Sequence, residues 1–127
     1  MMTPAARTLF LFGLYLLVAG TALLLVPALM LQPLGVPVPA DVWVRVVGLL
    51  AIALGLYYRV AARSELLAFM RLSVWVRLGV AAVFAAFVVG GLAPVALLGF
   101  GLIDAAGAAW TARALRQMGT GLAPQAA

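Results

Sequence analysis

The chain has 127 residues, of which 68% are hydrophobic and 9% charged, with a net charge of +5 and a mean hydropathy of +1.25. A water-soluble fold of this size has too small an interior to hide so much apolar surface. Eight arginines stand against three acids, but they lie singly at the edges of apolar runs, which excludes the dense basic face that nucleic acids require. In a bilayer only helices and closed barrels satisfy every backbone polar group. Because no period-two alternation occurs, we predict an all-α integral membrane protein.

Neither cysteine nor histidine occurs in the chain. This removes thiolate and imidazole ligands together with the commonest general base. Paired carboxylates are absent as well. We therefore expect no catalytic residue, no cofactor and no metal site, and we do not expect an enzyme.

The first apolar segment runs for 24 residues without a charge, from Thr8 to Leu31. That exceeds the roughly 20 residues needed to span the hydrocarbon core. We predict a helix over 8–31 after a short tail at 1–7. A cleaved signal peptide is the alternative interpretation, but the run is longer than a usual signal core and no small-residue cleavage site follows it.

The middle of the chain contains a break and two further helices. Residues 32–40 contain three prolines and one glycine, so we expect a loop there. A second helix is predicted over 41–62, with Asp41 at the positive end of its dipole. Ser64 and Glu65 resemble a helix start, which predicts a third helix over 65–89. In the alternative interpretation the membrane span begins only at Arg71.

The last helix is predicted over 94–115, after a tight turn at 90–94, and residues 117–127 are predicted to be a disordered tail. With short connections throughout, the expected fold is a single transmembrane domain over 1–127, an antiparallel up-down-up-down four-helix bundle. Arginines occur near both ends of the chain and in the central connection, but in neither other loop. The positive-inside rule therefore predicts that both termini are cytoplasmic.

Ionisable residues inside predicted spans are functional candidates, because a charge in the membrane is costly. Asp104 lies nine residues before Arg113 and Arg77 six residues after Arg71, which places them roughly 13 Å and 9 Å from the cytoplasmic boundary. Tyr15 falls at a similar depth. We predict that Tyr15, Arg77 and Asp104 form one buried polar cluster. Either it locks the bundle through an Arg77–Asp104 ion pair, or Asp104 is an ion or proton site.

Further candidate residues lie at helix ends and on helix faces. Arg45 follows Asp41 by four residues, so it can snorkel outward or pair along the helix. Small residues at helical spacing permit close approach of two backbones. The glycines expected to serve helix packing in this way are Gly13, Gly20, Gly48, Gly55, Gly101 and Gly107.

Residues 10–60 contain a series of features seen together in one family: Gly20 and Pro27 in the first helix, a Leu34–Gly35 loop, and then Arg45, Gly48 and Gly55. In these positions the chain resembles the small four-helix bacterial membrane proteins called DoxX-like. Some of those proteins are linked to quinone-dependent sulfur oxidation or redox homeostasis. The resemblance implies an accessory subunit in a bacterial cytoplasmic membrane, and it carries no catalytic motif across.

Two functions follow from these residues. The first is a structural or accessory subunit in the lipid bilayer, with another membrane protein or a second copy of the chain as its partner. The alternative is a small oligomeric transporter or channel that uses Asp104 and Arg77. A nucleic-acid partner is not expected.

Overall fold

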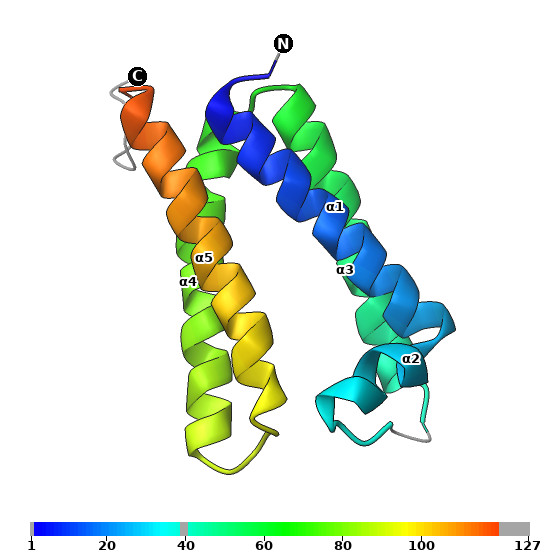
Figure 1. Cartoon of the computed structure of the whole chain (residues 1–127). Coiled ribbons are helices and arrows are strands. Elements are labelled where there is room, and N and C mark those ends of the chain that lie inside the picture. The colour runs from blue at the N-terminus through cyan, green and yellow to red at the C-terminus, as the bar shows by residue number, and fades with distance from the viewer. Residues whose placement is uncertain (1, 39–40, 120–127) are drawn as a thin grey trace. The chain divides into compact units, whose positions relative to one another are not determined.

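A computed structural model describes residues 2–38 and 41–119, and over these residues the chain is helical without strands, which confirms the all-α part of the predicted fold class (Figure 1). Two compact units are present: the first comprises Met1–Leu9 and Ala61–Ala127, the second Phe10–Val60. The single four-helix bundle stays a prediction. The helices are α1 (Pro4–Leu25), α2 (Pro27–Leu31), the 3-10 turn η1 (Gln32–Leu34), α3 (Trp43–Arg63), α4 (Leu67–Val89) and α5 (Ala96–Gln117).

Three of these helices, α1, α3 and α4, are long and apolar enough to cross a membrane. Between 17% and 28% of the residues in each span are buried inside the chain, so most of each span faces outward. Apolar surface of this extent is rare on soluble proteins and is consistent with a membrane protein. Helix α5 also has 22 residues, but Asp104, Arg113 and Arg116 make it more polar. A fourth crossing therefore stays a prediction.

Helix α1 begins at Pro4 rather than at the predicted Thr8. Thr3 explains the earlier start, because its Oγ1 accepts a hydrogen bond from the Ala6 amide at 3.3 Å. This is the N-cap arrangement, in which a hydroxyl satisfies an amide that has no partner within the helix. Proline is well suited to the first position after such a cap, since its missing N–H costs nothing there.

The predicted uninterrupted helix over 8–31 is wrong at its end, because α1 stops at Leu25 and α2 begins at Pro27. Proline has no N–H to donate, and its ring pushes the preceding residue out of the helical conformation. Val26 accordingly has φ −138° and ψ 58°. The following turn η1 occupies the start of the loop predicted over 32–40, of which residues 39 and 40 lie outside the described residues.

The connection between α3 and α4 is not the helix start that Ser64 and Glu65 predicted. The Leu66 amide donates to the Ala61 carbonyl at 3.0 Å and the Glu65 amide to the Ala62 carbonyl at 3.2 Å. These two hydrogen bonds form a Schellman motif, which ends a helix at its C-terminus and places the residue just after the helix in the left-handed conformation. Glu65 takes that position, at φ 51°, and α4 begins at Leu67 without a side-chain cap.

Helices α4 and α5 lie side by side and antiparallel in the first unit (Figure 1). The turn between them contains Gly91 at φ 74°, a conformation that favours glycine. A methyl group added to Gly101 would lie 3.6 Å from the Ala81 carbonyl oxygen and from the Phe84 Cβ, which is ordinary contact. Helix α5 is shifted by two residues from the predicted 94–115. The predicted tail lies outside the described residues from position 120 onward.

In the second unit α1 and α3 meet at glycines. A methyl group added to Gly48 would lie 2.6 Å from the Gly20 carbonyl oxygen, and one added to Gly20 would lie 2.6 Å from the Gly48 carbonyl oxygen. Gly13 and Gly55 form a second pair of the same kind, at 3.0 Å and 2.8 Å. Real Cβ atoms essentially never come closer than 3.0 Å, so three of these four distances leave no room for a side chain and the fourth is at the limit. The two backbones therefore touch directly, as in other small-residue contacts between membrane helices.

Candidate functional site

A buried hydrogen-bond network surrounds Arg77 of α4 in the first unit. The guanidinium Nη2 donates to Thr111 Oγ1 at 2.9 Å and to Ser73 Oγ at 3.3 Å, while Nε donates to the Ser73 carbonyl at 3.2 Å. Arg77 is 2% exposed and Thr111 fully buried. Ser73 precedes Arg77 by one helical turn, which places both side chains on the same face of α4. Together with Thr8, these residues form what we call the Arg77 network.

The network continues from α5 to the first turns of α1 and ends on the backbone. Thr111 Oγ1 lies 2.7 Å from Thr8 Oγ1, and Thr8 Oγ1 donates to the Ala5 carbonyl at 2.7 Å. A hydroxyl has one hydrogen to donate. Because the Thr8 hydrogen goes to the Ala5 carbonyl, Thr111 is the donor to Thr8, and its own oxygen accepts from Arg77. Hydrogen-bond donation thus runs in one direction, from the guanidinium to a backbone carbonyl.

Ser73 repeats this arrangement on the other side of the guanidinium. Its hydroxyl donates to the Met70 carbonyl at 2.8 Å and accepts from Arg77. Arginine stays protonated in proteins, and each hydroxyl hydrogen has a backbone or hydroxyl acceptor. The network therefore holds a fixed positive charge and joins α1, α4 and α5.

Asp104 is the second predicted residue in the first unit, half-buried on α5. The positive charge of Arg77 acts on its carboxylate, so the two belong to one electrostatic neighbourhood. Tyr15 belongs to the second unit, where its ring centroid lies 5.5 Å from that of Phe12. The three-residue cluster of Tyr15, Arg77 and Asp104 stays a prediction.

Arg45 of α3 holds the end of α1 in the second unit. Its Nη1 donates to the carbonyl of Leu24 and, at 3.5 Å, to that of Leu25. Carbonyls at a helix C-terminus lack amide partners within the helix. A cation is also favoured at this negative end of the helix dipole. Arg45 therefore caps α1 from the neighbouring helix.

The remaining predicted residues serve helix ends and helix contacts. Asp41 Oδ1 accepts from the Trp43 amide at 3.2 Å, at the start of α3. Of the six predicted glycines, four form the contact between α1 and α3, Gly101 lies against α4, and Gly107 is half-buried on α5.

Three residues of the Arg77 network are additional to the predicted candidates: Thr8, Ser73 and Thr111. The four-residue spacing of Ser73 and Arg77 was the one signal in the sequence that related a hydroxyl to the buried charge. Thr8 and Thr111 are 103 residues apart, so no local pattern connects them.

Residues 2–38 and 41–119 contain no strand and include three helices able to cross a membrane, which is consistent with a helical membrane protein. Comparison with models of protein families, with curated proteins and with solved structures found no match.

Proposed function

We propose that this chain is a small integral membrane protein of the bacterial cytoplasmic membrane, with cytoplasmic termini, that serves as a structural or accessory subunit of a membrane complex. The observation that carries the proposal is the Arg77 network. Arg77 is 2% exposed and its hydrogen bonds to Ser73 and Thr111 stay within the chain. Buried polar groups arranged in this way fix helices against one another and provide no surface for a solute.

Outward-facing small residues support an interaction with another membrane protein. Gly79 on α4 and Gly99 on α5 are exposed, and a methyl group added to either would meet no atom within 4 Å. Such positions allow a partner helix to approach the backbone closely. The resemblance of residues 10–60 to DoxX-like proteins favours the same accessory role.

A small oligomeric transporter or channel is the second candidate, favoured by Asp104. Its carboxylate is half-buried on α5 and lies within the field of Arg77. Proteoliposomes that contain wild type or Asp104→Asn distinguish the two functions. An accessory subunit gives no solute or proton flux from either protein, whereas a transporter gives flux that the variant loses.

The accessory function is tested by cross-linking in native membranes followed by purification in a mild detergent. We expect one membrane protein in a fixed ratio to the chain, and we expect Gly79→Leu or Gly99→Leu to lower that ratio. Val89→Leu is the matched control, since Val89 is 88% exposed on α4 and is already a large side chain. Isolation of the chain alone from several mild detergents contradicts the accessory function.

A further inference from the structure

Apart from Arg77 and Asp104, the charged residues of the first unit are concentrated at one end of its helices. Five arginines lie near the start of α1, the end of α3, the start of α4 and the end of α5, whereas residues 78–103 contain no charged side chain. Glu65 is the acidic residue among them, so the group has a net charge of +4. We call these residues the basic end: Arg7, Arg63, Glu65, Arg71, Arg113 and Arg116.

Hydrogen bonds within the first unit bring these helix ends together. The Glu65 carboxylate accepts from the Thr3 amide at 2.8 Å and from Thr3 Oγ1 at 2.7 Å, which joins the start of α1 to the connection between α3 and α4. The hydrogen bond between Thr8 and Thr111 joins α1 to the last turns of α5. Because α4 and α5 are antiparallel neighbours, the first turns of α4 lie at this same end.

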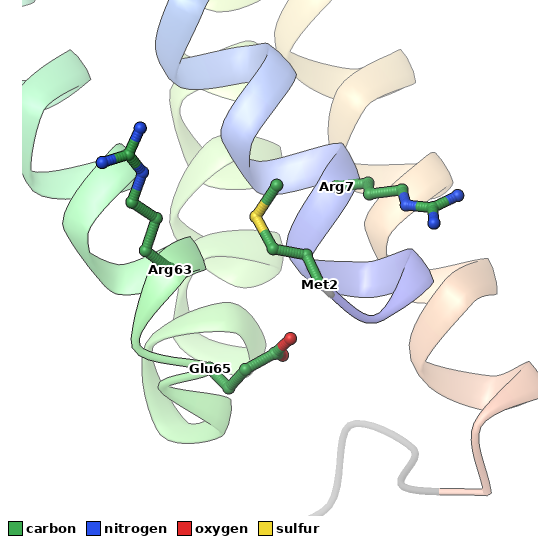
Figure 2. Close-up of a pocket in the computed structure, with 4 residues that line it drawn as sticks. All are labelled: Met2, Arg7, Arg63 and Glu65. Atoms are coloured by element: carbon green, nitrogen blue, oxygen red, sulfur yellow. The ribbon is translucent and has the colours of Figure 1, made fainter.

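A pocket of about 470 Å³ opens at the basic end, lined by Met2, Arg7, Arg63 and Glu65 (Figure 2). Figure 2 shows the side chains of Arg7 and Arg63 extending outward in different directions, with Met2 between their backbones. Both arginines are exposed. Both oxygens of the Glu65 carboxylate accept hydrogen bonds from Thr3, so the acid is directed at the backbone of α1. The pocket thus combines two outward cations with an apolar methionine side chain.

We propose that the basic end binds the phosphate groups of anionic phospholipids. The proposal rests on the proposed function as an integral membrane protein. Arg7 lies in the first turn of one candidate membrane span, and Arg63 is the last residue of another. The ends of a membrane span lie at the depth of the lipid headgroups, so both guanidinium groups can reach lipid phosphates. A guanidinium binds phosphate oxygens through two parallel hydrogen bonds. An anionic lipid offers a phosphate group to the two exposed arginines and an acyl chain to the apolar side chain of Met2.

Native mass spectrometry of the full chain in a neutral detergent tests the proposal. The probes are phosphatidylglycerol and phosphatidylcholine with identical acyl chains. We expect wild type to retain phosphatidylglycerol at lower lipid concentration than phosphatidylcholine. The double variant Arg7→Gln, Arg63→Gln should weaken phosphatidylglycerol binding about fivefold for each arginine removed. Arg45→Gln is the control, because it removes one arginine from the second unit and should leave lipid binding unchanged, whereas an effect of net charge alone would weaken binding about fivefold.

A second double variant, Arg113→Gln with Arg116→Gln, is expected to weaken phosphatidylglycerol binding by the same factor. It replaces the first double variant if the first loses its helical circular dichroism signal. Equal binding of the two lipids by wild type overturns the proposal, as does unchanged phosphatidylglycerol binding by a folded double variant. Displacement of the lipid by excess inorganic phosphate or by a short RNA also overturns it, because the site then belongs to a soluble anion. A chain that carbonate extracts from membranes contradicts the proposed function instead, so the two failures are distinguishable.

Discussion

The two units of the molecule hold their helices together by different means. In the second unit, residues 10–60, α1 and α3 meet where glycine backbones touch, as at Gly20 and Gly48. In the first unit, α1, α4 and α5 are joined by the side chains of the Arg77 network. A glycine contact depends on shape and fails when an atom is added. A polar network tolerates small changes of shape but fails when a hydrogen-bonding partner is removed.

The largest effect is expected at the glycine contact of the second unit. Gly48→Ala places a methyl group 2.6 Å from a backbone oxygen that cannot move aside alone. The helices must separate, which should lower the free energy of unfolding by about 1–3 kcal/mol. Unfolding by titration with sodium dodecyl sulfate in mixed micelles measures this. Gly79→Ala is the control, since its added methyl group meets no atom within 4 Å and should change stability by less than about 0.5 kcal/mol. Equal losses in both variants contradict the glycine contact.

A smaller loss is expected at Thr111. Thr111→Val keeps the shape but removes the acceptor for Arg77 and the donor for Thr8. Hydrogen bonds between membrane helices rarely contribute more than about 1.7 kcal/mol, so we expect unfolding to become easier by about 1–1.5 kcal/mol. Thr21→Val is the matched control, because the exposed Thr21 hydroxyl donates to Leu17 of its own helix. If both valine variants unfold alike, the Arg77 network does not stabilise the first unit.

The smallest effect is expected at the end of α1. Arg45→Gln removes the cation that caps the carbonyls of Leu24 and Leu25, which should lower stability by about 0.5 kcal/mol. Hydrogen exchange should become faster in the last turn of α1 and stay unchanged in α5. The control Arg113→Gln removes an exposed arginine from α5 and should leave exchange in α1 unchanged. Unchanged exchange near Leu24 in Arg45→Gln excludes the capping role.

The helices and their close-packing faces could be predicted because they follow from local patterns. The seven-residue spacing of Gly13 and Gly20, and of Gly48 and Gly55, indicated which face of each helix lacks side chains and allows another backbone to approach. Which glycine meets which depends on the register of two helices, and a single helix contains no information about that. The register became visible only in the structure.

Several helix ends were mispredicted although their signals are local. Thr3 and Pro4 are a local signal for a helix start, and Pro27 is a local signal for a helix end. Both signals were overlooked because the first helix was bounded by its charged residues, and its apolar sequence continues past Pro27. Glu65 resembled a helix cap because acids favour the first turn of a helix. Its actual role, accepting hydrogen bonds from Thr3, depends on a contact between residues 62 positions apart.

The candidate site was predictable only in its charged members. Arg77 and Asp104 are conspicuous because charges are costly in a membrane. The hydroxyls of Thr8 and Ser73 are not conspicuous, since each can satisfy a carbonyl of its own helix and so needs no distant partner. Their part in the network depends on packing between helices.

We propose that the hydrogen bond from Arg77 to Thr111 locks α4 against α5 in the first unit. The decisive test is a double-mutant cycle of Arg77→Gln and Thr111→Val, in which the free energy of unfolding of each variant is measured in lipid bicelles. We expect a coupling energy of about 1 kcal/mol between the two residues. A coupling energy indistinguishable from zero would contradict it.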